Sequence, residues 1–372
     1  MKKTLTILAL LFAFICNAQN SKLIIGTYTS GKSEGIYVYD FNTSTGDNHF
    51  ISSIKSSNPS FLAVSPNKKF VYAVNENGDS VNNGGTVSAY KFNKRKGKLN
   101  FINQQSSKGN DPCYISIDKT GKWTVAGNYS GGSFSILAVN KNGNVSPAAT
   151  TVQHSGKSIN KQRQEKAHVH TAVFSSDNKY LLVADLGIDK LMLYRFDEIT
   201  GTVTEDAAAS VSVSGGSGPR HLAIHPSQKF VYLTEELSGT VAAFNFADDG
   251  KLKMFQTISA VPESYKGSFG GADIHVSPDG KFLYASNRGE LNDLIIFSID
   301  TATGVLNVVG HQSTLGIKPR NFNFDPSGNF LLVANQESDN IVIFSVDHQT
   351  GLLKDTGKRI NVPNPVCIVW GE

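Results

Sequence analysis

Short runs of alternating apolar and polar residues, separated by glycine, asparagine, aspartate and proline, recur along the chain. Residues 240–246 (TVAAFNF) alternate with a period of two, and the turn sequence SPDGK at 277–281 separates two apolar runs. Period-two alternation bounded by such turn residues is typical of β-strands joined by hairpins. Helical periodicity is absent from these runs. The pattern therefore predicts an all-β protein.

One unit recurs six times in full. Copies begin at Asn58 (NPSFLAVSPNKKFVYAVNE), Gly218 (GPRHLAIHPSQKFVYLTEE), Gly271 (GADIHVSPDGKFLYASNR) and Lys318 (KPRNFNFDPSGNFLLVANQ), and more divergent copies begin at Asp111 and Val169. An aromatic residue opens the second predicted strand of each copy, at intervals of 48 to 57 residues: Phe70, Trp123, Tyr180, Phe230, Phe282 and Phe330. A four-stranded unit repeated at this spacing is a β-propeller blade.

The two ends of the chain supply one more blade. Residues 23–55 read as a second, third and fourth strand without a first, whereas residues 365–371 (PVCIVWG) read as a first strand alone. Pairing these segments closes the ring and leaves no open strand edge. The sequence thus predicts a seven-bladed β-propeller over residues 19–372, closed by the C-terminal strand joining the N-terminal strands.

The first residues have the features of a secretory signal peptide. Lys2 and Lys3 precede an apolar run from Leu5 to Ile15, and Ala18 is a small residue suited to the cleavage position. We expect residues 1–18 to be removed on export to the periplasm or the exterior; without that processing the protein would be cytoplasmic. The apolar run is too short to span a bilayer, and no later segment approaches twenty apolar residues.

Charge and cysteine content exclude further classes. The formal net charge is only +4, and no basic stripe is interleaved with stacking aromatic residues, so we expect no nucleic-acid partner. Cys113 and Cys367 fall inside apolar strands of blades that are not adjacent. Two cysteines of an exported chain can pair, but this placement favours two buried free thiols. We expect a monomer.

Propeller geometry places two alignment columns around the mouth of the central channel. The first follows the start of each first strand: Ser60, Cys113, His170, Arg220, Ala272, Arg320 and Val366. The second lies just past each second strand: Thr29, Glu76, Tyr129, Leu186, Glu236, Arg288 and Gln336. The residues before it are Tyr28, Asn75, Asn128, Asp185, Glu235, Asn287 and Asn335. We interpret this last column as mainly structural, because Asn and Asp side chains bond nearby backbone groups in tight loops.

The chemistry of the first two columns changes from blade to blade, which a purely structural repeat does not require. Charged and titratable candidates fall in four successive blades: His170, Arg220, Glu236, Arg288 and Arg320, with His168, His221 and Glu235 beside them. Charges gathered at a concave mouth are costly unless they are paired or used, so they indicate a ligand site. A surface ion-pair network is the alternative.

The connection before the copy at Val169 is unusual. Residues 155–166 (SGKSINKQRQEK) carry four basic residues against one acidic residue, Glu165. This segment arrives at the same mouth, where it could attract an anionic substrate. A solvated loop without a function is equally compatible with the sequence.

These segments resemble a known family. The strings QEKAHVHTAVFSSDNKYLLVADLGIDKL from Gln164, GPRHLAIHP from Gly218, GADIHVSPDGKFLYASNR from Gly271 and KPRNF from Lys318 are similar to the seven-bladed lactonases typified by bacterial 6-phosphogluconolactonase. The resemblance covers all blades. It implies a lactone hydrolase whose active-site residues are His170, Arg220, Glu236 and Arg288. Their place at or beside the same mouth makes His168, His221, Glu235 and Arg320 candidates for substrate binding.

The implied chemistry needs a base for water and positive charge near the carbonyl oxygen. His170, or Glu236 through a water, is suited to the first role, and the arginines are suited to the second. We expect no cofactor and no metal, because no metal-ligand motif is present. The substrate would be a sugar lactone: 6-phosphogluconolactone, or an unphosphorylated aldonolactone if the protein is exported. Two alternatives remain, a noncatalytic propeller that binds a sugar acid or a protein, and a lyase of the carboxymuconate-cyclase type within the same family.

Overall fold

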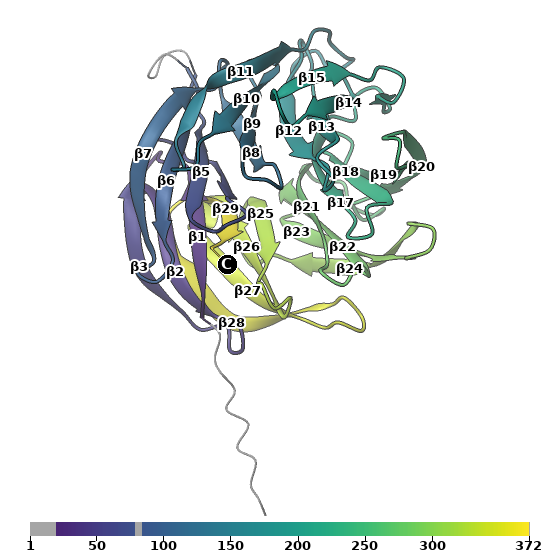
Figure 1. Ribbon diagram of the computed structural model, residues 1–372. Helices are drawn as coiled ribbons and strands as arrows, with labels where there is room; N and C mark the ends of the chain where they lie inside the picture. The colour runs from purple at the N-terminus through teal and green to yellow at the C-terminus, as the bar shows by residue number, and fades with distance from the viewer. Residues whose placement is uncertain (1–19, 79–83, 372) are drawn as a thin grey trace, which may run out of the picture.

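The computed structural model describes residues 20–78 and 84–371. Seven antiparallel sheets surround a central axis, with the first strand of each sheet innermost and the fourth outermost (Figure 1). This arrangement is the predicted seven-bladed β-propeller. The proposed signal segment, residues 1–18, lies outside the described residues.

Blades are numbered here from the first complete copy of the unit. Blade 1 contains β4 (Phe61–Val64), β5 (Phe70–Asn75), β6 (Thr86–Asn93) and β7 (Lys98–Ser106). Blade 2 contains β8 (Pro112–Ile117), β9 (Trp123–Asn128), β10 (Ser133–Val139) and β11 (Val145–Gln153). Blade 3 contains β12 (Val169–Phe174), β13 (Tyr180–Asp185), β14 (Lys190–Asp197) and β15 (Thr202–Glu205), and the short β16 (Val211–Ser212) also pairs with β14.

The remaining blades follow the same order. Blade 4 contains β17 (Pro219–Ile224), β18 (Phe230–Glu235), β19 (Thr240–Phe246) and β20 (Leu252–Ser259). Blade 5 contains β21 (Phe269–Val276), β22 (Phe282–Gly289), β23 (Asp293–Ile299) and β24 (Leu306–Ser313). Blade 6 contains β25 (Pro319–Phe324), β26 (Phe330–Asn335), β27 (Asn340–Val346) and β28 (Leu353–Asn361). Blade 7 contains β29 (Pro365–Trp370), β1 (Asn20–Thr27), β2 (Gly35–Asn42) and β3 (Asn48–Lys55).

Blade 7 closes the ring as predicted. Strand β29 pairs antiparallel with β1, placing Ile24 opposite Val369 and Ile25 opposite Ile368. The backbone of Gly371 adds a further hydrogen bond to Lys22 O at 2.9 Å. Because β29 enters from the other end of the chain, these bonds hold the two termini of the domain in one sheet.

Apolar side chains from neighbouring sheets form a hydrophobic cluster between each pair of adjacent blades. Two of these clusters include residues of blade 7, one against blade 6 and one against blade 1. The core is therefore continuous around the ring. Burial of this apolar surface is the main contribution to the stability of such a fold.

The recurring aromatic residue of the second strand has a packing role between blades. Trp123 of blade 2 lies beneath Gly201, in the turn between the third and fourth strands of blade 3, where an added Cβ would stand 2.2 Å from the ring. Gly201 also has a positive φ of 73°, which favours glycine. Phe70, Tyr180, Phe230, Phe282 and Phe330 meet a glycine of the next blade in the same way. The aromatic column thus joins neighbouring blades.

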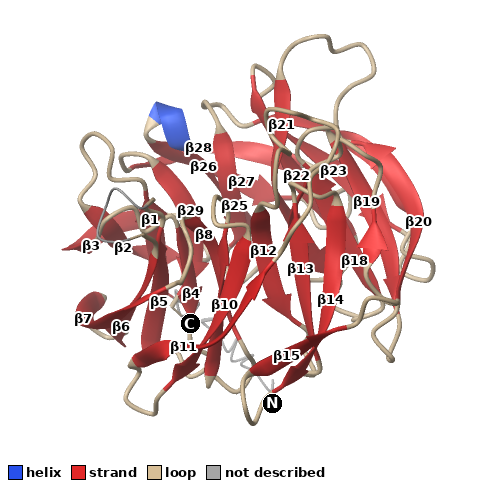
Figure 2. Ribbon diagram, turned by 90° about the horizontal axis from the view of Figure 1, so that it is seen from above, coloured by secondary structure: helices blue, strands red, loops and turns tan. Residues whose placement is uncertain are grey.

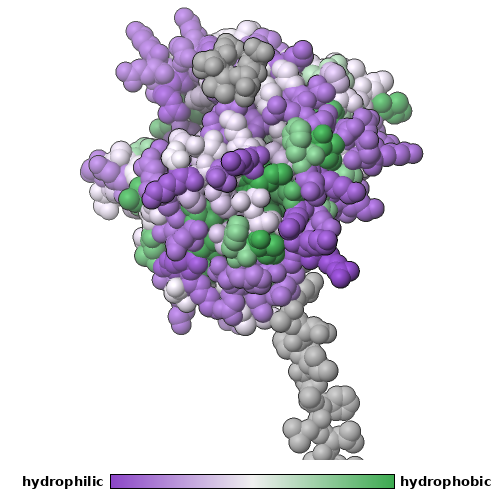
Figure 3. Space-filling model, turned by 90° about the vertical axis from the view of Figure 1, so that its left-hand side faces the viewer, coloured by the Kyte–Doolittle hydropathy of each residue, from purple (hydrophilic) through white to green (hydrophobic). Residues whose placement is uncertain are grey.

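Strand dominates the described backbone, as Figure 2 shows, and the 3-10 turn η1 (Gln336–Ser338) is the helical element within residues 20–78 and 84–371. In that part of the chain no helix is long and apolar enough to cross a membrane. The side of the ring that carries β3 and β7 is hydrophilic over most of its area, with apolar side chains in small groups (Figure 3). Cys113 and Cys367 are buried free thiols, as predicted.

Candidate active site

A cavity of about 290 Å³ lies where first strands begin and second strands end. Residues from all seven blades and from one connection line it: Tyr28, Glu76, Cys113, Tyr129, Arg163, His170, Glu236, Arg288 and Arg320. With the exceptions of Tyr28 and Arg163, these residues belong to the two columns that the repeat placed at the mouth. Equivalent positions in the repeated blade are therefore what gather them.

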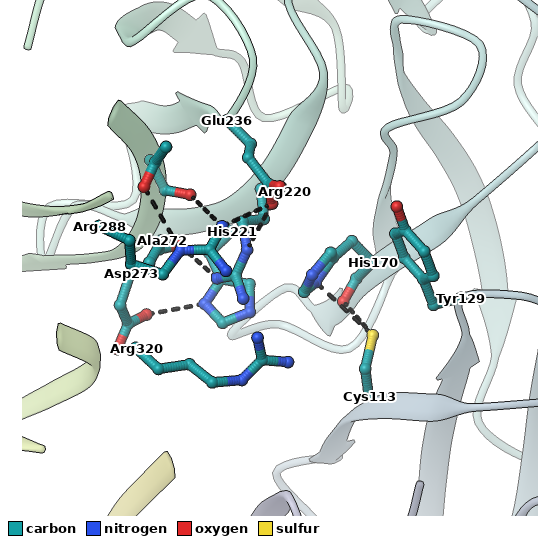
Figure 4. A network of polar contacts seen from close by, with 12 residues as sticks. Cys113, Tyr129, His170, Arg220, His221, Glu236, Ala272, Asp273, Arg288 and Arg320 are labelled. Atoms are coloured by element: carbon teal, nitrogen blue, oxygen red, sulfur yellow. Dashed lines mark hydrogen bonds and ion pairs between the residues drawn. The ribbon is translucent and has the colours of Figure 1, made fainter. Parts of the chain in front are cut away.

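Glu236 is the centre of the charged cluster (Figure 4). Its Oε2 lies 3.0 Å from Arg220 Nε and 3.0 Å from Arg288 Nη2, and its Oε1 accepts a hydrogen bond of 2.7 Å from Arg163 Nη2. Arg220 and Arg288 are also held by backbone carbonyls, of Ala272 and of Gly271 respectively. One buried carboxylate thus fixes the positions of three guanidinium groups.

These ion pairs decide the protonation state of Glu236. Burial alone would raise the pKa of its carboxyl group, but Arg288, Arg220 and Arg163 outweigh burial and lower the pKa to about 2. Burial and the neighbouring Arg288 and Arg320 lower the pKa of Arg220 to about 9, which leaves it charged at neutral pH. Glu236 and Arg220 consequently remain ionised near pH 7.

His170, in β12, lies beside this cluster and is buried. Its Nδ1 lies 3.6 Å from the Cys113 sulfur, and Figure 4 shows the two side chains facing each other. Burial, followed by the charge of Arg220 and the proximity of His221, lowers the pKa of His170 well below 6.5. His170 is therefore a neutral imidazole at pH 7, able to accept a proton.

Comparison with known proteins assigns this arrangement to a family. The family described as "Lactonase, 7-bladed beta-propeller" matches residues 22–370. The chain belongs to this lactonase family.

Individual relatives agree with that assignment. This lactonase-family chain is 41% identical over 323 residues to a 6-phosphogluconolactonase of Formosa agariphila, covering 86% of this chain and 90% of that protein. It is 35% identical over 349 residues to the 6-phosphogluconolactonase of Bacillus subtilis, covering 92% and 96%. The structure of a periplasmic gluconolactonase of Pseudomonas aeruginosa superposes with a TM-score of 0.90 at 36% identity, covering 95% of this chain and 99% of that one.

The structure brings together five of the predicted residues of this lactonase-family site. His170, Glu236, Arg288 and Arg320 line the cavity, and Arg220 lies directly behind them against Glu236. His168, His221 and Glu235 are not among the lining residues. His168 stacks on Tyr129, with ring centroids 4.6 Å apart, and so supports a lining residue from behind.

Glu235 points away from the cavity. Its carboxylate accepts a hydrogen bond from Thr240 Oγ1, and burial raises its pKa. Asn75, Asn128 and Asn287 in the same column donate to backbone carbonyls of the segments that enter their blades. This agrees with the structural interpretation of that column, to which Glu235 belongs.

His221 lies deeper in the channel of the lactonase fold. Its Nδ1 lies 2.8 Å from Asp273 Oδ1, and both residues line a second cavity of about 260 Å³. Burial and Arg220 lower the pKa of His221 to about 4. Its ring centroid is 5.1 Å from that of His170, so His221 packs behind the proposed base.

Sequence reasoning did not single out Tyr28, Glu76, Tyr129, Cys113 or Arg163 as site residues. Glu76, Tyr129 and Cys113 stood in the mouth columns, so their position could have been inferred. Tyr28 was the one aromatic residue in a column otherwise made of Asn, Asp and Glu, and that departure was a usable signal. Arg163 was one of four basic residues on the connection, and nothing in the sequence distinguished it from the others.

Proposed function

We propose that this protein opens the ring of a sugar lactone by hydrolysis, with His170 as the base. The observation that carries this proposal is a neutral, buried imidazole next to guanidinium groups that converge on one cavity. The membership in the lactonase family and the names of its relatives support the same reaction. They favour neither the noncatalytic propeller nor the lyase.

The step follows from these positions. His170 takes a proton from water, the water oxygen bonds to the lactone carbonyl carbon, and the carbonyl oxygen becomes negatively charged. Arg288, which lines the cavity within the Glu236 cluster, stabilises that oxyanion. When the ring carbon–oxygen bond breaks, His170 returns the proton to the leaving oxygen. The product is a hydroxy acid.

We assign Glu236 the role of holding the arginines in place, not that of the base. A carboxylate with a pKa of about 2 has too little proton affinity to deprotonate water near pH 7. Its contacts instead support a role in holding Arg163, Arg220 and Arg288. Because Arg220 is buried, its charge would be costly without this partner.

We further propose that residues 1–18 are an export signal and that residues 19–372 act outside the cytoplasm as a monomer without a nucleic-acid partner. A signal-like segment and a periplasmic relative support export. In that compartment an unphosphorylated aldonolactone is the favoured substrate; in the cytoplasm it would be 6-phosphogluconolactone.

A panel of aldonolactones tests the activity. Hydrolysis of D-glucono-1,5-lactone and of 6-phosphogluconolactone is followed by proton release, with the spontaneous rate subtracted. We expect turnover above the spontaneous rate for at least one of them, and loss of that turnover in His170→Ala. Absence of catalysis with every lactone would overturn the proposal.

A further inference from the structure

The cavity has a second polar wall that the proposed hydrolysis does not use. Tyr28 follows β1, Glu76 follows β5 and Arg320 lies on β25, so this wall comes from blades 6, 7 and 1. The cluster around Glu236 comes mainly from blades 4 and 5. Since both groups line one cavity within a ring, they face each other across it.

The three side chains of this wall contact one another. Tyr28 donates a hydrogen bond of 2.8 Å from its hydroxyl to Glu76 Oε2. The Arg320 guanidinium lies over the Tyr28 ring, 5.2 Å from its centroid, and its Nη2 is 3.9 Å from Glu76 Oε2. Glu76 is thereby oriented by a phenol and weakly paired with a cation.

Much of the hydrogen-bonding capacity of this wall is unused. Arg220 and Arg288 donate to backbone carbonyls, but Arg320 makes no hydrogen bond to any residue in 20–78 or 84–371. Oxygen Oε1 of Glu76 likewise has no hydrogen-bond partner in the described part of the chain. Both side chains are largely buried, at 15% and 17% exposure, so the cavity is where their free donors and acceptor can be satisfied.

The type of group that fits follows from the mixed character of this wall. A hydroxyl both donates and accepts, so one hydroxyl can donate to Glu76 while a neighbouring one accepts from Arg320. A phosphate or carboxylate could bond Arg320 but would meet the negative charge of Glu76. Neighbouring hydroxyls therefore satisfy this wall better than an anion does.

We propose that Tyr28, Glu76 and Arg320 form a subsite that binds two neighbouring hydroxyl groups of the sugar, opposite the carbonyl end at His170. This subsite rests on the proposed function for the orientation of the substrate, and it would make Glu76 a specificity-determining residue. It selects polyhydroxylated lactones over plain cyclic esters of the same ring size.

The test compares ligands that differ in hydroxyl groups. Binding of D-gluconate and of 5-hydroxypentanoate is measured by calorimetry, and turnover of D-glucono-1,5-lactone and of δ-valerolactone is measured in parallel. In Glu76→Gln we expect the affinity for gluconate and the kcat/KM for gluconolactone to fall about tenfold to a hundredfold, the usual effect of losing a hydrogen bond to a charged group. The values for the two hydroxyl-poor compounds should change less than about threefold.

Two further variants test whether the effect of Glu76→Gln is specific to the subsite. Glu337→Gln alters an exposed carboxylate paired with Lys318 and should leave all values unchanged. Tyr28→Phe keeps the ring but removes the hydroxyl that orients Glu76, and should weaken gluconate binding by a smaller factor. Melting temperatures of all variants verify that they fold. If binding of 5-hydroxypentanoate is too weak to measure, the change in affinity for gluconate is the result that tests the subsite.

Three results would overturn the subsite. Glu76→Gln could leave gluconate binding unchanged, or it could weaken hydroxyl-rich and hydroxyl-poor ligands equally. It could also strengthen binding of inorganic phosphate together with gluconate, which would make Arg320 an anion site. Failure of the proposed function looks different: the parent protein would show no turnover, while its affinity for gluconate would still depend on Glu76.

Discussion

Arg163 donates a hydrogen bond of 2.7 Å to Oε1 of Glu236, from a position 73 residues earlier in the chain. The same guanidinium lies 3.2 Å from the Tyr129 hydroxyl. Arg163 belongs to the connection between β11 and β12, which is anchored where Gln164 Nε2 donates to Leu186 O at 2.9 Å. This connection is therefore part of the cavity wall.

We predict that Arg163→Ala acts mainly on the binding of anionic substrates. Glu236 keeps Arg220 and Arg288, so the remaining cluster stays ionised and kcat should change less than about threefold. The cavity loses one positive charge, so KM for 6-phosphogluconolactone should rise about tenfold, and more than KM for gluconolactone. Steady-state kinetics with both lactones measures this difference.

The control for Arg163 is Arg195→Ala, which breaks a comparable ion pair with Asp206 on the outer surface. It should leave both KM values unchanged. An equal rise of KM for the two lactones in Arg163→Ala would contradict an electrostatic role for this side chain.

A second prediction separates the base from the residue that holds the arginines. His170→Ala should lower kcat by about 10²–10⁴-fold, the usual contribution of a positioned base. Glu236→Gln should also lower kcat and raise KM. In addition it should reduce the free energy of unfolding by about 3–5 kcal/mol, because buried guanidinium groups lose their partner. Kinetics and thermal melting of both variants distinguish the roles.

Arg320→Ala is the comparison within the same cavity. It is expected to raise KM more than it lowers kcat, because Arg320 lies on the wall opposite the Glu236 cluster. If His170→Ala and Glu236→Ala both retain the parental rate, the catalytic residues lie elsewhere.

The pH dependence of activity should follow His170. Because burial, Arg220, His221 and Arg320 lower its pKa well below 6.5, the imidazole is neutral above that value and gains a proton only at lower pH. We expect kcat/KM to be flat from about pH 6.5 to 8 and to fall towards acid below that range. Arg320→Ala removes one of the charges that lower this pKa, so its acid limb should move to higher pH.

Rates corrected for spontaneous hydrolysis at each pH measure this profile. A parental acid limb centred above pH 6.5 would contradict the assignment of His170 as a neutral base. So would an acid limb that moves to lower pH in Arg320→Ala.

The repeat explains why much of the site could be predicted from sequence. His170, Arg220 and Arg320 occupy one position in three blades, and Glu236 and Arg288 share another. A residue's place in a blade fixes its place at the mouth, so alignment within one chain was sufficient. Alignment was less able to decide which of two adjacent residues faces the cavity. Glu235 ends β18 and accepts a hydrogen bond from Thr240, whereas Glu236 follows the strand and pairs with the arginines of the cavity.

Residues outside the repeat could not be placed in this way. Arg163 lies on a connection without a counterpart in the other blades, and its contact with Glu236 depends on how Ser158 and Gln164 anchor that connection. Tyr28, in contrast, does occupy a repeat position in blade 7, and its aromatic ring in a column of Asn, Asp and Glu set it apart. For Arg163 the position depends on tertiary contacts that one sequence does not encode as a pattern.

Export is the next prediction. The segment from Met1 to Ala18 has the charge and apolar length of a signal peptide. Protein isolated from its native cells should therefore begin near Gln19, as measured by mass spectrometry of the N-terminal peptide. An intact Met1 in the cytoplasmic fraction would contradict export and would make 6-phosphogluconolactone the favoured substrate.

Closure of the ring by β29 leads to the last prediction. Deleting residues 365–372 removes the partner of β1 and takes Val366, Cys367 and Ile368, all buried, out of the core. Strand β1 would then expose an unpaired edge, which favours aggregation. Loss of even one such large apolar side chain costs about 2–5 kcal/mol, so we expect the truncated protein to aggregate or to melt far below the full chain.

A synthetic peptide covering residues 363–372, added in excess, should raise the melting temperature of whatever remains soluble, because it restores the missing strand. The same peptide with proline at position 368 cannot donate the backbone hydrogen bond that Ile368 makes to Asn321 Oδ1 at 2.7 Å, and should restore less. A truncated protein that melts like the full chain would show that blade 7 is stable without β29.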